Sequence, residues 1–323
     1  MSDELSAESP CLLRLWAYVK ERFPPIGNGL LIVSYYSCNQ FLAQALTKPA
    51  EPMRYTLATL IGAMTLLALF FHLRVFDEHK DYEEDCRNYP DRVLQRGLIT
   101  LRDLKILGGL AIGFELVVAI VWAVFVSPAP LIAIVVVLVF SLLMLKEFFV
   151  GNWLRKHFLI YATSHMLIMP LFAMVVYSYT VSEYLWEASG WFWFYAFVGF
   201  FVTFNWEISR KIQAPQDERE GVDSYTKVLG TYGAAYAVLL VRIIDTGMVA
   251  AVGYYLELAW WFYAVLIALY SVCLIGFFQF RFYTTRATAK RMEIYAGMYI
   301  IAFDIALALA LSSSRGVTFT WIP

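Results

Sequence analysis

Charged residues are scarce in this chain of 323 residues, at 16%, whereas 60% of the residues are hydrophobic. With a mean hydropathy of +0.62, the chain is too apolar for a soluble globule, and its composition indicates a polytopic membrane protein. The lipid bilayer is therefore an expected partner. A net charge of −1 and the lack of a basic tract exclude a nucleic-acid-binding protein. No pattern in the sequence points to a protein partner.

Cysteine is also sparse. The four cysteines (Cys11, Cys38, Cys86 and Cys273) form no CxxC pair and no metal-binding spacing, so they are expected to be free thiols. The chain also lacks Gly/Ser-rich linkers, low-complexity segments and repeats of fixed period, which favours one integral-membrane domain over residues 1–323.

Long apolar runs dominate the remaining sequence, each near the ~20 residues that cross a bilayer as a helix. They lie at roughly 28–46, 55–76, 104–126, 129–149, 158–180, 186–206, 232–256, 259–280 and 292–312. We therefore predict an all-α bundle of nine transmembrane helices. Residues 1–27 are expected to form a cytoplasmic, interfacial segment, in which a helix from Leu12 to Phe23 is ended by Pro24 and Pro25.

Basic residues predict the orientation of this bundle. Of the 25 Lys and Arg, all but four fall in the N-terminal segment or near the connections after predicted helices 2, 4, 6 and 8. The exceptions are Lys48, Arg54 and Arg315, on the other side, and the intramembrane Arg242. The positive-inside rule then places the N-terminus and two polar cap loops, about 77–103 and 207–230, in the cytoplasm, and the C-terminus on the opposite side.

Three aspartates four residues apart form the most informative pattern. On a helix, Asp77, Asp81 and Asp85 drift by only about 80° around one face, and such like charges destabilise the helix unless a cation relieves them. Carboxylate oxygens favour Mg²⁺, or Mn²⁺, shared with substrate phosphate oxygens. Arg92 and Arg96 follow with forked donors suited to phosphate. The alternative is a solvated loop of mixed charge, since other charged residues lie among the three.

The stretch from Asp77 to Gly97, DEHKDYEEDCRNYPDRVLQRG, resembles the first aspartate motif of the UbiA superfamily of intramembrane prenyltransferases. The three aspartates stand at its acidic positions and Arg92 at its arginine. The chain departs from that motif with Asp77 where Asn is usual and Val93 where Pro is usual.

A second stretch, from Asn205 to Gly230, resembles the other motif of the superfamily at its two ends. Its middle departs, because acidic and basic residues replace a second DxxxD. The residues concerned are Glu207–Ile208 at the start, Gly221–Val222 near the end, and Lys211, Ala214–Pro215, Asp217, Glu218 and Glu220 between them. Lys146 resembles the diphosphate-binding lysine of the superfamily.

The resemblance implies Mg²⁺-dependent chemistry on an isoprenyl diphosphate, in which the leaving group is neutralised and an allylic carbocation forms in an apolar pocket. The residues expected to act in catalysis and to hold metal are Asp77, Asp81 and Asp85, with Asn205, Glu207 and Asp217 as further metal ligands. The residues expected to bind the diphosphate are Arg92, Arg96, Lys146, Arg210 and Lys211.

These motifs leave three functions open. Their sequences resemble most the terpene cyclase branch of the superfamily, so we predict a terpene cyclase. Asn205, Ser209 and Gln213 also resemble the metal triad of soluble terpene cyclases, with Gln in place of Glu. The alternative role of Asn205 and Ser209 is capping or hydrogen bonding between helices. The alternative enzyme is a prenyltransferase acting on an aromatic or lipid acceptor. The third is a non-catalytic transporter or scaffold.

Four charged residues interrupt the apolar runs: Glu115, Arg242, Asp245 and Asp304. Ionisable groups inside a membrane bundle usually face its interior and pair there. We expect a structural network between helices in preference to a proton or ion path.

Overall fold

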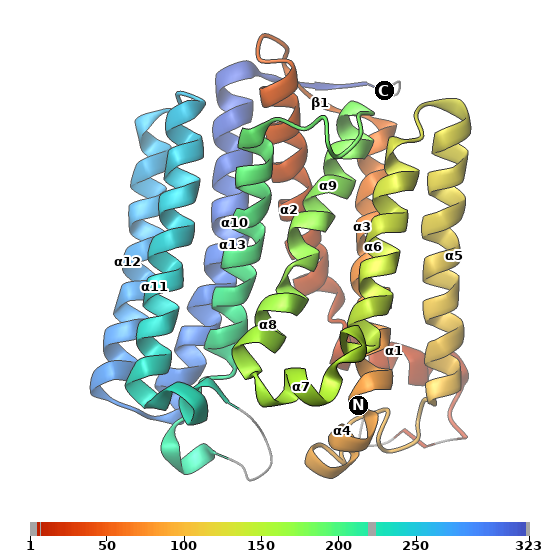
Figure 1. Ribbon diagram of the computed structural model, residues 1–323, viewed down its shortest axis with the longest axis vertical. Helices are drawn as coiled ribbons and strands as arrows, with labels where there is room; N and C mark the ends of the chain where they lie inside the picture. The colour runs from red at the N-terminus through yellow and green to blue at the C-terminus, as the bar shows by residue number, and fades with distance from the viewer. Residues whose placement is uncertain (1–4, 7, 219–223, 321–323) are drawn as a thin grey trace.

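The structure is a computed structural model that describes residues 5–6, 8–218 and 224–320. Its long helices stand side by side in one bundle, with the short helix α4 at one end and the strand β1 at the other (Figure 1). We call these the α4 end and the β1 end. The helices are α1 (Cys11–Arg22), α2 (Pro25–Thr47), α3 (Leu57–Lys80), α4 (Tyr82–Asn88), α5 (Leu101–Phe125), α6 (Ala129–Leu145), η1 (Glu147–Phe149), α7 (Gly151–Lys156), α8 (Phe158–Met166), α9 (Ile168–Val181), α10 (Gly190–Arg210), η2 (Pro215–Asp217), α11 (Tyr225–Tyr255), α12 (Trp260–Phe282) and α13 (Arg286–Arg315).

The predicted all-α class is confirmed, since the described residues add only the three-residue strands β1 (Met53–Tyr55) and β2 (Val317–Phe319). Within those residues, six helical segments are long and apolar enough to cross a membrane: α3, α5, α8 with α9, α11, α12 and α13. Helix α6 is apolar but shorter, and α2 and α10 lie on the two other expected runs. The count of nine spans therefore stays a prediction.

The proline pair between α1 and α2 sets the angle of the N-terminal segment. Helix α1 ends at Arg22, and Pro25 occupies the first turn of α2, where a missing N–H costs no hydrogen bond. This agrees with the predicted helix from Leu12 to Phe23. The turn lays α1 across the α4 end of the bundle, where Phe23 contacts Phe71 of α3 at 5.4 Å between ring centroids.

A left-handed turn follows α6. Glu147, Phe148 and Phe149 have φ angles of 47°, 53° and 59°, a region that costs a non-glycine residue roughly 1–2 kcal/mol. Such a conformation persists only where its surroundings impose it. Here the Phe148 ring packs against Phe140 and His165, each 5.6 Å away between centroids. The turn directs the chain from α6 into α7 across the α4 end.

The β1 end is closed by a parallel strand pair. Met53 lies opposite Val317, and Tyr55 stacks on Phe319 with ring centroids 5.5 Å apart. This pairing joins the turn between α2 and α3 to the segment that follows α13 (Figure 1). The turn between α2 and α3 is therefore held in a defined position.

The buried charged residues all make polar contacts, and most of these contacts join different helices. Glu115 of α5 meets His72 of α3 at 2.8 Å, and the Tyr195 hydroxyl of α10 donates to Asp304 of α13 at 3.3 Å. Arg242 lies 3.0 Å from Asp245 on its own helix, α11, and reaches α10 as well. These contacts tie neighbouring helices together in the bundle interior.

Candidate active site

The three aspartates of the first stretch lie where α3 gives way to α4. Asp81 stands between the two helices with φ −98° and ψ 7°, so helices occupy the start of the segment predicted as a cap loop and the stripe is divided between α3 and α4. The hydrogen bonds Asp81 N–H to Asp77 O (2.9 Å) and Asp85 N–H to Asp81 O (2.8 Å) nevertheless continue the helical pattern. The spacing of the stripe is thus retained across the change of helix.

Asp85 is held by two arginines. The Arg92 Nη1 donates to its carboxylate at 2.7 Å, and Arg22 of α1 approaches the same oxygen to 3.7 Å. The Arg92 guanidinium lies 3.6 Å from the centroid of the Tyr89 ring. Burial and repulsion from Arg22 lower the pKa of Arg92, with Asp85 opposing the shift. The contacts with Asp85 and Tyr89 hold the Arg92 side chain beside the aspartates.

A second ion-pair cluster adjoins the stripe and was not predicted. Glu78 is buried, and its carboxylate accepts from Arg22 at 2.6 Å and from Arg74 at 2.8 Å. The i, i+4 spacing of Arg74 and Glu78 could have revealed their pair from the sequence. Arg22 could not have been found in this way, because it belongs to a different helix.

Asp81 carries the least compensated charge of the three aspartates. Burial raises its pKa to about 6, the neighbouring carboxylates Asp77 and Asp85 add to the rise, and the Lys80 ammonium opposes it. Lys80 also lies 3.6 Å from Asp77. Crowded carboxylates of this kind bind a cation favourably, because a cation stabilises their ionised forms.

The argument for a metal at this site depends on the carboxylate oxygens of the three aspartates. No group of three or more His, Cys, Asp or Glu side chains in the described part of the chain is already arranged around one point. Asp77 and Asp81 offer carboxylate oxygens of the type that Mg²⁺ prefers. Asp85 would have to loosen its pair with Arg92 before it could join them. The metal role of the three aspartates thus stays a prediction.

The end of α6 reaches the aspartate stretch. A small cavity is lined by Asp77 and Lys80 together with Met144 and Leu145, the residues just before Lys146. Within the described ranges, Lys146 has no ion-pair partner. Lys146, the predicted diphosphate-binding lysine, therefore directly follows two residues that share a cavity with Asp77.

The second polar stretch forms the wall of a cleft of about 780 Å³ at the α4 end. Glu207 lies 2.5 Å from Arg210 and 2.9 Å from Lys211, and both basic residues line the cleft. Tyr89, which follows α4, lines the same cleft. Residues of both polar stretches therefore line one cavity.

The cleft also contains residues that the motifs do not predict. Arg286 and Lys290, from the first turns of α13, face the second loop across it. Asp217 lines the cleft as well, and its Oδ2 is buried with no hydrogen-bond partner among the described residues. An unpaired buried carboxylate oxygen costs free energy unless a cation or donor reaches it, so Asp217 fits the metal role predicted for it.

Two predicted site residues point elsewhere in this structure. The Asn205 side chain is fully engaged, since it donates to Val238 O and accepts from Arg242, both at 2.7 Å. Arg96 donates to Leu5 O at 3.4 Å. A ligand role for either residue requires these contacts to break. The predicted motif residues Glu220, Gly221 and Val222 lie outside the described residues.

Comparisons with known proteins identify the family and the fold. The model of the UbiA prenyltransferase family matches residues 32–303, and no curated protein matches by sequence. Among solved structures, a digeranylgeranylglyceryl phosphate synthase superposes with a TM-score of 0.62 at 16% identity, covering 93% of this chain and 99% of that one. A UbiA homologue from Aeropyrum pernix K1 gives 0.63 at 16% identity, covering 88% and 97%. The chain belongs to the UbiA prenyltransferase family.

Proposed function

We propose that the protein is a Mg²⁺-dependent integral membrane enzyme that transfers the prenyl group of an isoprenyl diphosphate to an acceptor. One observation carries the proposal: the aspartate stretch and the basic second loop contribute to the same end of the bundle and meet at one cleft. Family membership supplies the reaction class. We further propose that this end faces the cytoplasm, on the distribution of basic residues.

The residues divide into two roles. Asp77, Asp81 and Asp85 would hold the metal, with Glu207 and Asp217 as candidates from the second loop. When bound, Mg²⁺ neutralises the negative charge that develops on the diphosphate. The basic side chains at this end donate hydrogen bonds to the diphosphate oxygens and hold the leaving group in place. They are Arg92, Lys146, Arg210 and Lys211.

The bond changes follow from this placement. The bond between the prenyl carbon and the diphosphate oxygen breaks, its electron pair leaves with the diphosphate, and an allylic carbocation remains. The acceptor donates an electron pair to the cation and then loses a proton. Water must be kept out until transfer is complete, which the apolar helices of the bundle favour.

Prenyl transfer is preferred here to the terpene cyclisation predicted from the motif wording. The matching family model describes prenyltransferases, and the proteins of similar fold include a digeranylgeranylglyceryl phosphate synthase. Neither finding favours a cyclase.

The deciding experiment is a product profile of the purified protein. It is incubated with C10, C15 and C20 diphosphates and Mg²⁺, with and without lipid and phenolic acceptors. Prenylated product that depends on the acceptor is expected, and Asp81→Asn should lack it. Cyclic hydrocarbon formed without acceptor would instead identify a cyclase, and unreacted diphosphate under every condition would favour a non-catalytic protein.

A further inference from the structure

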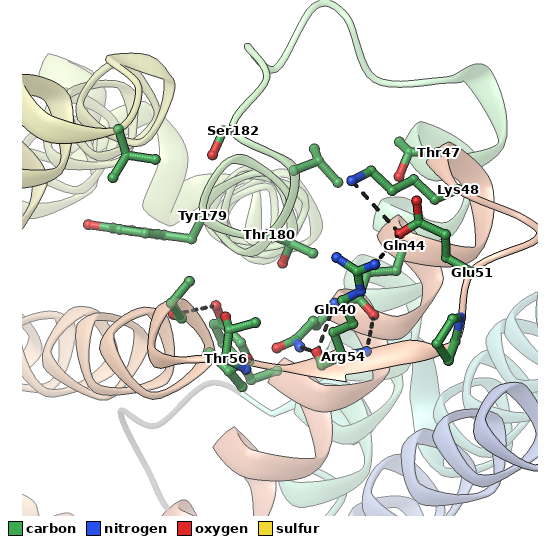
Figure 2. Close-up of a pocket in the computed structure, with 16 residues that line it drawn as sticks. Gln40, Gln44, Thr47, Lys48, Glu51, Arg54, Thr56, Tyr179, Thr180 and Ser182 are labelled. Carbon is green, nitrogen blue, oxygen red and sulfur yellow. Dashed lines mark hydrogen bonds and ion pairs between the residues drawn. The ribbon is translucent and has the colours of Figure 1, made fainter. Parts of the chain in front are cut away.

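A pocket whose lining includes charged and amide side chains lies at the β1 end (Figure 2), the end of the bundle opposite the aspartates. It has a volume of about 280 Å³ and lies where α2 and α9 end and α3 begins. This is just under the roughly 300–1,000 Å³ typical of sites for drug-sized ligands. The pocket therefore suits a small polar group such as a lipid headgroup.

Three charged side chains converge on one wall of the pocket. Arg54 lies 2.9 Å from Glu51, and the Lys48 ammonium approaches the same carboxylate oxygen to 4.0 Å (Figure 2). The Lys48, Glu51 and Arg54 side chains remain 59%, 43% and 42% exposed. Two cations beside one carboxylate leave a net positive charge, which matches the single negative charge of a phosphodiester.

Gln40, which lines the same pocket, carries a buried acceptor. Gln40 is 2% exposed, and its Nε2 donates to Arg54 O at 2.5 Å. Because that partner is a carbonyl oxygen, the amide nitrogen must point toward it, and Oε1 has no hydrogen-bond partner among the described residues. A buried oxygen in this state costs about 1–3 kcal/mol unless a donor reaches it. A ligand with a hydrogen-bond donor would satisfy Gln40 Oε1.

Backbone and side-chain hydrogen bonds hold the pocket wall in place. Gln44 pairs with the Arg54 backbone twice, accepting from its N–H at 2.8 Å and donating to its carbonyl at 2.9 Å. Strand β1, which contains Arg54, pairs with β2. Binding to a preformed site of this kind loses little conformational entropy.

Basic residues are rare at this end of the bundle, and all three of them belong to this region. Lys48 and Arg54 line the pocket, and Arg315 donates to Pro49 O of the same turn at 3.2 Å. Helix ends in a membrane bundle lie at the level of the lipid phosphates, where Lys and Arg side chains reach headgroups. The placement favours a lipid over a solute.

We propose that this outer pocket, lined by Gln40, Lys48, Glu51 and Arg54, binds a phospholipid headgroup in which the phosphodiester is joined to a hydrogen-bond donor. Arg54 and Lys48 contact the phosphate oxygens. The headgroup hydroxyl or ammonium donates to Gln40 Oε1 and to Glu51. The inference stands independently of the proposed catalytic function.

The test compares short-chain lipids that share the phosphodiester and differ in the donor. Full-length protein, stripped of lipid in a neutral detergent, is titrated with dihexanoyl phosphatidylethanolamine, phosphatidylglycerol, phosphatidylcholine and phosphatidylmethanol, and bound lipid is counted by native mass spectrometry. The first two carry a donor and should bind at least about tenfold tighter than the last two, the worth of one charge-assisted hydrogen bond. Equal affinity for all four would overturn the proposal.

Variants connect this selectivity to the pocket. Arg54→Gln should weaken binding of the donor lipids by about tenfold or more, whereas Arg102→Gln, an exposed arginine at the α4 end, should leave it unchanged. Gln40→Met should remove the preference for phosphatidylglycerol over phosphatidylmethanol. If Arg54→Gln does not fold, Lys48→Gln tests the same charge at a more exposed position. Unchanged affinity in the folded charge variant would contradict the proposal.

A soluble ligand is distinguished in the same assay. Glycerophosphoglycerol and glycerophosphoethanolamine carry the same phosphodiester and donor without acyl chains. They should compete with the lipids only at concentrations at least about a hundredfold higher, because they bury no chains. Competition at equal concentration would assign the pocket to a free phosphate ester and refute a lipid site.

Discussion

Asp81 is a residue that lowers the stability of the metal-free protein and is proposed to bind the metal. It lies just beyond α3, where burial and neighbouring carboxylates raise its pKa to about 6 from 3.8. A carboxyl group whose pKa is raised on folding favours the folded state only while it is protonated. Ionising Asp81 in the folded protein therefore costs free energy. A bound cation would offset this cost, because it stabilises the ionised carboxylate.

The pH dependence of stability tests this reading of Asp81. In EDTA, the wild-type protein should lose stability as the pH rises from about 4 through about 6, because the unfolded chain ionises this group first. Asp81→Asn should lack this component and should be at least as stable as wild type at neutral pH. Thermal unfolding in detergent measures both. Identical pH profiles for the two proteins would contradict the assignment.

The same substitution should remove catalysis. Asp81→Asn keeps the side-chain volume but removes the charge expected to hold the metal, so turnover of an isoprenyl diphosphate should fall below detection while folding is retained. The matched control is Asp103→Asn, since Asp103 lies outside the cleft and its carboxylate accepts from the backbone N–H of Thr100, the N-cap of α5. Near-normal activity of Asp81→Asn would remove the aspartate stripe from the site.

Arg92 should contribute to binding of the diphosphate. Arg92→Ala is expected to weaken diphosphate affinity by about 1.5–3 kcal/mol, the worth of a hydrogen bond between charged groups. Inorganic diphosphate titrated with Mg²⁺ by calorimetry gives the affinity without turnover. Arg102→Ala, at an exposed position on α5, should show no change. An unchanged affinity in Arg92→Ala would exclude this role.

At the scale of single elements, two features depart from regular helix geometry. One is the left-handed turn η1, with three successive residues at positive φ, and the other is Gly230, at φ 73°, inside α11. Glycine adopts positive φ without strain, so Gly230 lets α11 change direction near the second loop. The η1 turn has no glycine, so the free energy of its strained backbone must be offset by side-chain packing, such as the ring contacts of Phe148.

Relief of that strain should be measurable. Phe149 is 77% exposed and has φ 59°, so Phe149→Gly removes little packing and relieves a left-handed conformation. The expected gain is up to about 1 kcal/mol of unfolding free energy. Phe149→Ala removes the same ring without relieving the backbone and should not be stabilised. Thermal shift in detergent compares the two variants, and equal stability would mean that the turn is not strained.

Arg242 joins three elements in the bundle interior. It contacts Asn205 of α10 and Asp245 of α11, and its guanidinium lies 3.6 Å from the ring centroid of Tyr299 of α13. Removing one partner of a buried ion pair leaves the other charge uncompensated, which costs about 3–5 kcal/mol. Arg242→Leu should therefore destabilise more than the double variant Arg242→Leu/Asp245→Leu. Additive losses in a double-mutant cycle would show that the pair is not coupled.

At the scale of the whole molecule, the two ends of the bundle differ in chemistry. The α4 end carries the aspartates, the cleft and most basic residues, and the β1 end carries the strand pair and the outer pocket. The positive-inside rule predicts that the α4 end is cytoplasmic. This orientation would separate the proposed catalytic site from the proposed lipid site by the thickness of the membrane.

Single-cysteine labelling tests the orientation. In a background without the four native thiols, Asn88→Cys should react with an impermeant reagent only after intact cells are opened, and Glu257→Cys should react from outside. The physical reason is that basic loops are retained in the cytoplasm during insertion. Labelling of position 88 on intact cells would reverse the topology.

Composition and periodicity alone determined the helical class, and the spacing of the aspartates determined which stretch could carry the chemistry. These features are local: a helix needs only an apolar run of sufficient length, and i, i+4 neighbours share a face in any helix. The family resemblance could likewise be recognised from Asp77 to Gly97, because the motif is contiguous. The break at Asp81 was not foreseen, since the same residues are compatible with one continuous helix.

Only the tertiary structure decided which distant residues meet. Arg22 reaches Glu78 and Asp85 because the proline pair turns α1 across the α4 end, and Arg286 shares a cleft with Arg210 because α13 packs against α10. Asn205, which the spacing assigned to metal, is instead engaged by Arg242 from the next helix. Each of these contacts depends on how helices pack, which involves partners far apart in the chain and is not encoded in any one stretch.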